Sequence, residues 1–376
     1  MRRYLYVTMI LFAFTGIACP PSPPPIVLKK DDLKPDAIPA PPETPDELKT
    51  RIEAALEQVR ARDLLTTNAF WTVFHGILGS GLERTMLTVP DTRKKVNAIE
   101  YICEGNGIRG LQFLPTKHGL DVLTATPMNQ LEGAAQGHQD QFIAEMAQWG
   151  MKRDKKFKVG GQVYEFEDFI RQSKMRASVK GTPPQELSWA IIIIGQYYGT
   201  NHEWTNTAGE NLRFDDVVRY EVDAPINEAA CGGTHRLFGL TWAYHLHMKN
   251  RGQKTGVWVD VDAKIELYKQ LAKKYQSPDR SMSTEYFKSP DRKPDPIARI
   301  STTGHIVEWL ALAMTDEELK SMWMQEAVQA LAMMILDMRN EGIDSGALYH
   351  AAHGLQLYHD RVFGTPAPYL PLPPKK

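Results

Sequence analysis

The last third of the sequence contains three short stretches in which a histidine follows small residues and precedes an apolar run. They are Cys231-Gly-Gly-Thr-His235, Ser301-Thr-Thr-Gly-His305 and Gly346-Ala-Leu-Tyr-His350. Glu308 follows His305 closely enough that both side chains share one face of a helix. Imidazole, thiolate and carboxylate groups bind zinc, and histidine also exchanges protons near neutral pH. The stretches therefore suggest a metal site or acid–base chemistry.

A zinc site is the first of these possibilities. If each stretch begins a helix on the inside of the fold, the candidate ligands lie near one rim of a central cavity. These ligands are Cys231, His235, His305 and His350. A set that mixes sulfur and nitrogen suits zinc better than magnesium or calcium. The sequence suggests zinc as a cofactor and no other.

Acid–base chemistry without a metal is the second possibility. Its candidate residues, of which His305 and Glu308 form the closest pair, are His235, His305, Glu308 and His350. They would act on an unidentified ligand in the cavity, such as a glycan.

The third possibility is a structural role for these histidines, because polar residues near helix starts satisfy free backbone N–H groups. The chain would then be a non-catalytic scaffold or interaction protein. Among the enzymatic possibilities, we expect ligand binding or glycan-directed acid–base chemistry ahead of a zinc-dependent, transferase-like enzyme.

The hydrophobic pattern predicts the elements that carry these residues. Each run is apolar almost all round, which is typical of helices surrounded by other helices. Such runs alternate with amphipathic stretches at intervals of about 45 residues, as in helical repeat arrays. The sequence therefore predicts an all-α fold for residues 45–363. The predicted inner helices are near residues 68–78, 187–198, 234–248, 302–314 and 346–361.

Other parts of the sequence add detail to this prediction. Residues 79–136 show weak periodicity and several turn-forming glycines, so we expect a small irregular or β insertion there. Gly160-Gly161 predicts a tight hairpin. Thr44 and Thr315 each precede a glutamate at the spacing of a capping box, which predicts a helix start at both places. A proline-rich tail, residues 364–376, follows the domain.

The alternation of buried and amphipathic helices resembles the α/α toroid of the terpenoid-cyclase and prenyltransferase superfamily. Cyclases of this superfamily end an outer helix with a glutamine and a short Asp-Gly-Ser-aromatic turn. Gln276, Asp279 and Ser281 match that motif, whereas Arg280 and Met282 replace the glycine and the aromatic residue. The resemblance implies inner helices that surround a central cavity and outer helices that cover them.

The resemblance is less complete for the chemistry of the superfamily. Farnesyltransferase-type members hold zinc with aspartate, cysteine and histidine, and Tyr349-His350 resembles part of that pattern. Asp260-Val-Asp262 lacks the closing aspartate of the squalene-type acidic motif, so we expect no activity of that type. Residues 135–363 also resemble an uncharacterised group of exported bacterial proteins with the same Gly-Gly-Thr-His and Thr-Gly-His phrases.

The N-terminal residues predict export. Residues 1–18 combine Arg2 and Arg3 with an apolar run too short to span a membrane comfortably, which is typical of a signal peptide. Cys19 follows a small residue, as at the lipidation site of bacterial lipoproteins. The proline-rich linker 19–44 would then hold the domain off a membrane surface. We expect a lipid or signal anchor in the cell envelope, with the protein in the outer membrane or the periplasm.

Composition excludes some classes of partner and scaffold. The formal net charge of -1 gives no overall field that would attract nucleic acid, so we expect no nucleic-acid partner. Besides Cys19 the chain has only Cys103 and Cys231, too few for a disulfide-built scaffold in a domain of this size. The sequence does not decide whether these two cysteines pair.

Overall fold

A computed structural model describes residues 43–126, 128–182, 185–292, 295–339 and 342–373. All of them belong to one unit of the chain, Pro39–Lys376. Within these residues the structure has thirteen α-helices, two short 3-10 helices and four two-stranded hairpins. The prediction of a mainly helical fold is confirmed.

Six largely buried helices form the inside of this unit. Their residues are buried on nearly every side, as in the isoleucines 191–194 of α6, so other elements must surround them. The sequence predicted five of them as inner helices but did not predict this position for α4. They are α2 (Phe70–Leu78), α4 (Gln141–Gln148), α6 (Ser188–Tyr198), α8 (Thr234–Lys249), α10 (Pro296–Ala313) and α13 (Ser345–Val362).

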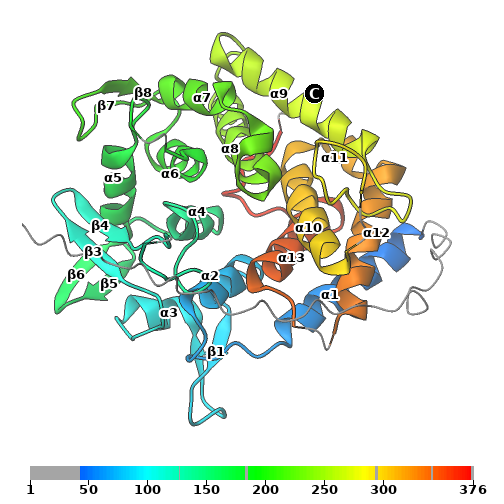
Figure 1. Ribbon diagram of the computed structural model, residues 1–376, viewed down its shortest axis with the longest axis horizontal. Coiled ribbons are helices and arrows are strands. Elements are labelled where there is room, and N and C mark those ends of the chain that lie inside the picture. Colours follow the sequence, from blue (N-terminus) through cyan, green and yellow to red (C-terminus); the bar gives the residue numbers. More distant parts are fainter. Residues whose placement is uncertain (1–42, 127, 183–184, 293–294, 340–341, 374–376) are drawn as a thin grey trace, which may run out of the picture. The chain divides into compact units, whose positions relative to one another are not determined.

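The inner helices contact one another in a closed order. Helix α2 contacts α4, α4 contacts α6, α6 contacts α8, α8 contacts α10, α10 contacts α13, and α13 contacts α2. Figure 1 shows this succession, from the blue α2 through the green α6 and α8 to the orange-red α13. The first and last inner helices are therefore neighbours although they are far apart in the sequence.

Amphipathic helices cover the inner set. In α1 the buried residues Leu48, Ile52 and Leu56 lie one turn apart, so a single face packs inward, against α12 and α13. Helix α5 packs on α6, α7 on α6 and α8, and α9 on α8. The helices outside the inner set are α1 (Pro45–Arg60), α3 (Ala98–Cys103), α5 (Phe166–Arg176), α7 (Phe214–Asp223), α9 (Val257–Lys274), α11 (Asp316–Leu319) and α12 (Met322–Asp337).

The structure corrects the predicted start of one inner helix. The sequence predicted this helix from residue 302, but α10 begins at Pro296. Asp295 caps it by accepting a hydrogen bond from the Ile297 N–H, and proline fits the first helical position because no N–H is needed there. Ser301 and His305 therefore lie inside the helix and not at its start.

Two predicted helix caps are confirmed. The capping boxes at Thr44 and Thr315 are both present. The helix that Thr315 starts ends at Leu319, and α12 begins at Met322. Thr315 therefore caps a short helix that is followed by a longer one.

Antiparallel hairpins make up the small β content, including the hairpin predicted at Gly160-Gly161. Two of them lie in the predicted insertion, and the described residues contain no sheet larger than two strands. The pairs are β1 (Thr85–Leu87) with β2 (Lys95–Asn97), β3 (Phe113–Thr116) with β4 (Gly119–Val122), β5 (Lys156–Val159) with β6 (Gln162–Glu165), and β7 (Glu203–Thr205) with β8 (Asn211–Arg213).

Glycines allow α10 and α13 to approach closely. A Cβ atom added at Gly304 would lie 2.8 Å from the Cβ atom of Ala351, and one added at Gly354 would lie 2.8 Å from the backbone nitrogen of Glu308. Neither position accepts a larger side chain unless the helices move apart. This close contact brings Glu308 of α10 within reach of the histidines on α13.

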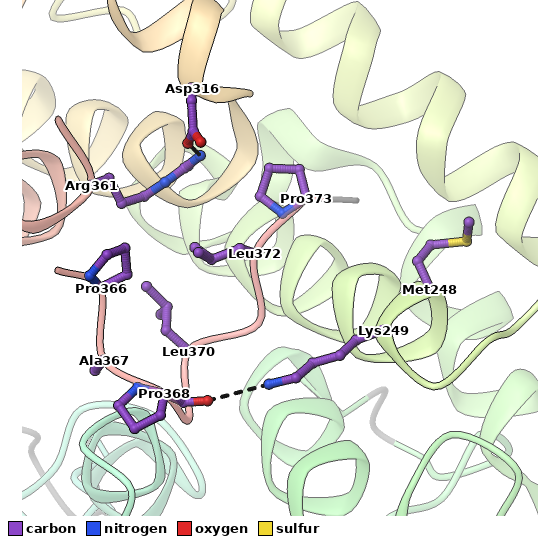
Figure 2. Close-up of a pocket in the computed structure, with 10 residues that line it drawn as sticks. All are labelled: Met248, Lys249, Asp316, Arg361, Pro366, Ala367, Pro368, Leu370, Leu372 and Pro373. Carbon is purple, nitrogen blue, oxygen red and sulfur yellow. Dashed lines mark hydrogen bonds and ion pairs between the residues drawn. The ribbon is translucent and has the colours of Figure 1, made fainter. Parts of the chain in front are cut away.

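The tail after α13 folds back along the same unit. The Pro371 carbonyl accepts a hydrogen bond from Nδ1 of His245 at 3.2 Å, and the Lys249 ammonium donates to the Pro368 carbonyl at 3.3 Å (Figure 2). The tail, α8 and neighbouring side chains that include Arg361 enclose a pocket of about 530 Å³. The proline-rich tail is thus packed against the domain along residues 364–373.

Several predictions concern residues outside the described ranges. The signal peptide 1–18, the lipidation at Cys19 and nearly all of the linker 19–44 fall there. Among the described residues, no helix is both long enough and apolar enough to cross a membrane. Cys103 and Cys231 are described, and both are free thiols.

Candidate metal centre

Three inner helices bring the predicted histidines together. His235 lies at the start of α8, His305 in the middle of α10 and His350 in the second turn of α13. The ring centres of His305 and His350 are 4.2 Å apart, and that of His235 lies 5.5 and 5.6 Å from them. All three side chains are buried. The histidines expected around the rim of a cavity instead form an interior cluster.

A sharp turn before α8 fixes the position of the cysteine. Cys231 has φ 49° and ψ 43°, and Gly232 and Gly233 follow with φ 63° and 88°. Successive residues in the left-handed region are costly for any residue except glycine. The ring of Tyr286 also packs so closely on Gly232 that no side chain fits there. The two glycines therefore make the turn that places the Cys231 thiol beside the histidines.

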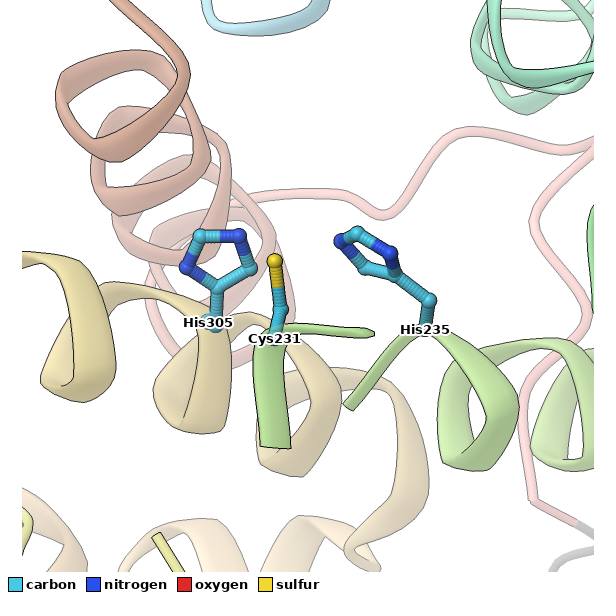
Figure 3. Close-up of side chains that lie close together, drawn as sticks. All are labelled: Cys231, His235 and His305. Atoms are coloured by element: carbon cyan, nitrogen blue, oxygen red, sulfur yellow. The ribbon is translucent and has the colours of Figure 1, made fainter. Parts of the chain in front are cut away.

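The structure gathers three of the four predicted zinc ligands into one set. The Sγ atom of Cys231 and one ring nitrogen each of His235 and His305 lie within 4.8 Å of one another. Figure 3 shows the sulfur between the two rings. Ligand atoms around a tetrahedral zinc are about 3.5 Å apart, given bonds of about 2.0 to 2.3 Å, so small side-chain movements would close the site. His350 belongs to a neighbouring set instead.

Two further sets of metal-binding side chains adjoin this one. Within each, one ligand atom per residue lies within 4.8 Å of the others. One set is fully buried, and the other includes partly exposed residues. The buried set is His75, Glu145 and His350, and the other is His138, Glu186 and His235. His235 belongs to two of the three sets. Possible metal ligands therefore follow one another without a gap from the partly exposed His138 to the interior.

His235 is the least satisfied side chain in the cluster. It is 5% exposed, and neither of its ring nitrogens has a hydrogen-bond partner. A neutral imidazole has one donor and one acceptor, and an unpaired buried polar group costs about 1 to 3 kcal/mol. Such groups are rare in folded proteins and call for an explanation such as a bound ion. The pairing of His235 is therefore incomplete without a ligand.

Two neighbouring histidines, His305 and His75, are oriented by hydrogen bonds from their Nδ1 atoms. Nδ1 of His305 donates to the Ser301 carbonyl at 2.7 Å, and Nδ1 of His75 donates to the Trp71 carbonyl at 2.8 Å. A carbonyl only accepts hydrogen bonds, so Nδ1 carries the proton in both rings and Nε2 keeps the lone pair. Histidines that bind metals are commonly oriented in this way, because the bond fixes the ring and leaves one nitrogen for the metal.

Glu308 joins α10 to two histidines of α13. Its Oε2 accepts a hydrogen bond from Nδ1 of His350 at 2.7 Å, and its Oε1 accepts one from Nδ1 of His353 at 2.6 Å. Burial alone would raise the pKa of Glu308, but the charges and hydrogen bonds of these histidines hold the pKa below its usual value. The sequence suggested a pair with His305, whereas both carboxylate oxygens are directed to α13. Glu308 therefore orients histidines and is not a free base.

Burial determines the protonation of the first set. Burial and the nearby His350 lower the pKa of His305 to about 3, and burial with the surrounding imidazoles lowers the pKa of His235 well below its usual value. Burial, with help from nearby carboxylates, raises the pKa of the Cys231 thiol to about 12. The imidazoles are thus neutral and ready to bind a metal, whereas the thiol must release its proton on binding.

The cavity between these residues is small. Besides residues of the cluster, Gln148, Trp189 and Phe238 line it. The space available to the centre of a water-sized sphere is about 10 Å³. That volume holds about one water molecule. A sugar ring has no room in it, so the central cavity gives no support to glycan-directed chemistry at this place.

Arg236 positions His235 and does not join the cluster. Its Nε donates to Oε2 of the buried Glu221 at 2.7 Å, and its Nη1 donates to the Pro225 carbonyl at 2.7 Å. Glu221 also accepts hydrogen bonds from the Leu187 N–H and the Ser188 hydroxyl. One carboxylate of α7 thus ties the start of α6 to the start of α8, which carries His235.

Sequence reasoning missed several members of the cluster. His353 follows His350 by one helical turn and shares its face, a spacing that was visible in the sequence. Glu145 is the one acidic residue in the otherwise apolar or amide-bearing helix α4, which was also a usable signal. His75 and His138 carry no such pattern, because each stands alone in its segment. Their positions depend on which helices become neighbours.

Comparison of the chain with protein-family models, with curated proteins and with solved structures finds no match. The chemistry of the cluster therefore follows from its own residues and geometry.

Proposed function

We propose that this chain is a zinc-binding protein whose metal is held by Cys231, His235 and His305. The observation that carries the proposal is the buried imidazole of His235, which has no partner for either ring nitrogen. A zinc ion among these three side chains would bind one nitrogen of His235, the lone pair on Nε2 of His305 and the thiolate of Cys231. Their ligand atoms lie within 4.8 Å of one another.

The types of ligand support zinc over harder cations. Thiolate and imidazole are typical zinc ligands, whereas magnesium and calcium prefer carboxylate and carbonyl oxygens. Three protein ligands leave one position of a tetrahedral site open, as in catalytic rather than structural zinc sites. The small cavity lined by His235, His305 and His350 adjoins that position and has space for one small ligand.

We propose further that the helices form an α/α toroid, and the closed order of contacts among the inner helices supports this arrangement. The relation to the terpenoid-cyclase and prenyltransferase superfamily is part of the same proposal. It agrees with a zinc ion held on the inside of the ring. Squalene-type cyclase activity is not proposed, because the acidic motif at Asp260-Val-Asp262 is incomplete.

The proposed location is the cell envelope, with the protein exported and tethered through a lipid on Cys19 or an uncleaved signal. The sequence of residues 1–19 supports it. Replacing the cysteine, Cys19→Ala, should remove the lipid mass and release the protein from the membrane fraction. A variant that stays in the membrane with unprocessed mass would show a plain N-terminal anchor instead.

Cobalt substitution tests the zinc site in the full-length protein. Co²⁺ added to metal-stripped protein should produce the near-ultraviolet charge-transfer band of a thiolate bound to cobalt, because Cys231 supplies the sulfur ligand. Cys231→Ser should abolish that band. His235→Ala should weaken Zn²⁺ binding by more than about 100-fold, since removal of a direct ligand exceeds the roughly 10- to 100-fold loss typical of a supporting residue.

His245→Ala is the matched control for this experiment. His245 is as buried as His235 and lies on the same helix, but its Nδ1 is bonded to the Pro371 carbonyl. This variant should keep both the charge-transfer band and the zinc affinity. If wild-type protein gives no such band, or if His235→Ala binds zinc normally, the proposed site is wrong. The non-catalytic scaffold would then be the better interpretation of the histidines.

A further inference from the structure

A second group of side chains lies deeper than the proposed zinc ligands. His75 comes from α2, Glu145 from α4 and His350 from α13, so three inner helices meet at this point. One ligand atom of each lies within 4.8 Å of the other two, and all three residues are buried. Two imidazoles and one carboxylate are a common ligand set for divalent transition metals.

Glu145 is difficult to explain without a cation. The residue is fully buried, its Oε1 accepts a hydrogen bond from the Gln141 amide at 3.0 Å, and its Oε2 has no partner. A buried carboxyl oxygen without a hydrogen-bond partner is rare in folded proteins and calls for an explanation such as a bound ion. A cation bound at this point would supply the missing partner.

The two histidines of this group are oriented by bonds on their far sides. Nδ1 of His75 donates to the Trp71 carbonyl, and Nδ1 of His350 bonds to Oε2 of Glu308. In His75 the lone pair is on Nε2, which lies 3.9 Å from Oε1 of Glu145. The Gln141 amide is 3.2 Å from the same Nε2, so one amide now donates to both acceptors. A cation beside Glu145 would replace that amide as the partner of His75.

We propose that the cluster binds a second divalent metal ion through His75, Glu145 and His350, which makes the centre dinuclear. The ring of His350 lies 4.2 Å from the ring of His305, so the second ion would be adjacent to the first. This inference rests on the proposed function in that both ions share one cluster. It adds a site whose ligands contain oxygen and nitrogen but no sulfur.

Zinc titration of metal-stripped, full-length protein tests the second site. Calorimetry with elemental analysis should give two equivalents of Zn²⁺ for the wild type. Glu145→Gln should keep one equivalent together with the thiolate-to-cobalt band when Co²⁺ is used, because Cys231 is unaffected. Cys231→Ser should also keep one equivalent, but without that band. Circular dichroism and thermal unfolding of each variant verify that the loss does not arise from unfolding.

Other outcomes of the titration distinguish failure of the second metal site from failure of the proposed zinc site. One equivalent in the wild type, lost in Cys231→Ser and unchanged in Glu145→Gln, would refute the second site and keep the first. One equivalent lost in Glu145→Gln and kept in Cys231→Ser would refute the first and keep the second. No binding in the wild type would overturn both. His245→Ala, a buried histidine outside the cluster, should bind as much zinc as the wild type.

Discussion

The two ends of α8 each bury a histidine, but the environments of these residues differ. His245, near the C-terminal end of the helix, bonds through Nδ1 to the Pro371 carbonyl of the folded-back tail. His235, at the N-terminal end, has no partner for either nitrogen although it is similarly buried. The difference shows that this fold can pair a buried histidine with backbone where the role is structural. The unpaired ring of His235 is therefore the feature on which the proposed zinc site rests.

Backbone carbonyls at the C-terminal end of α10, beside the folded-back tail, also have hydrogen-bond partners. We call this end of the inner helices the tail end. The Arg361 guanidinium donates from Nη1 to the Ala311 and Met314 carbonyls at 2.8 and 2.7 Å. Its Nη2 donates to Asp316 at 2.6 Å, and Figure 2 shows this pair. Only its Nε lacks a partner. These bonds satisfy carbonyls at the C-terminal end of α10, where backbone carbonyls have no helical partner. We therefore expect substitutions at the tail end to change mainly the free energy of unfolding. Substitutions in the region of His235, His305 and His350, the histidine end, should change mainly the affinity for metal.

The largest effect is expected at the tail end. Arg361→Met should lower the free energy of unfolding by roughly 2 to 5 kcal/mol, because the Ala311 and Met314 carbonyls lose their donor at about 1 to 3 kcal/mol each, whereas Asp316 is more than half exposed and stays solvated. Chemical denaturation measures this loss, which should be the same size with and without zinc. If the variant instead loses zinc and keeps its stability, the division between the two ends is wrong.

Zinc itself should stabilise the protein through the histidine end. At a free zinc concentration of about 100 times Kd, binding to the folded state adds about 2.7 kcal/mol to the free energy of unfolding. His235→Ala should lose the part of this gain that comes from the ion held by Cys231, His235 and His305, and His245→Ala should keep all of it. Thermal unfolding with and without Zn²⁺ gives the comparison. An equal zinc effect in the two variants would contradict the contrast between these histidines.

A smaller effect of opposite sign is expected for His235 in the absence of metal. His235→Leu should raise the free energy of unfolding of the metal-free protein by about 1 kcal/mol, because it replaces an unpaired buried polar ring with an apolar side chain. The matched change His245→Leu should lower it by a similar amount, since the Pro371 carbonyl loses its donor. Destabilisation by both changes would mean that His235 has an unseen structural partner.

Acid should weaken the metal-free protein, and His245 contributes one of the protons responsible. Burial lowers the pKa of His245 to about 3, so the folded state stays unprotonated there while the unfolded chain binds a proton below its ordinary pKa of about 6.5. Its contribution is fully present above pH 6.5 and is lost as the pH falls toward 3, at about 1 kcal/mol per pH unit. Denaturation at several pH values should give a shallower slope for His245→Asn than for the wild type.

Glu145 provides the control for the sign of this slope. Burial raises its pKa, so its contribution to stability is lost as the pH rises through that pKa and opposes the histidines. Glu145→Gln should therefore steepen the rise of stability with pH in the metal-free protein. A flatter profile in this variant would mean that the carboxyl is ionised in the folded state.

Local patterns in the sequence predicted much of the helical framework. The caps at Thr44 and Thr315 and the hairpin at Gly160-Gly161 depend on residues within a few positions, and all three are confirmed. The predicted start of α10, residue 302, was wrong because the apolar run begins only after Ser301, whereas the helix is capped further upstream, by Asp295. Hydrophobic runs mark the buried part of a helix, and polar first turns can precede them.

The composition of the cluster could be predicted only in part. His235, His305 and His350 share a repeated phrase, so the sequence pointed to them together. His75 and Glu145 belong to the same cluster because α2 and α4 lie beside α13 and α6, and no short pattern encodes that neighbourhood. The direction of Glu308 toward α13 likewise depends on the close contact at Gly304 and not on its spacing from His305.

The contact of α13 with α2 has a consequence for how the protein reaches this structure. The ring of inner helices is complete only when a segment near residue 350 meets one near residue 75, so its closing step joins parts of the chain with very large separation in sequence. Contacts of this kind form slowly because a long loop must close first. A nascent chain on the ribosome can assemble its earlier helices one after another, but it cannot form the contacts of α13 with α2 and α10. Until α13 has been synthesised, α2 and α10 both keep an uncovered apolar side, and exposed apolar surface of this kind favours aggregation.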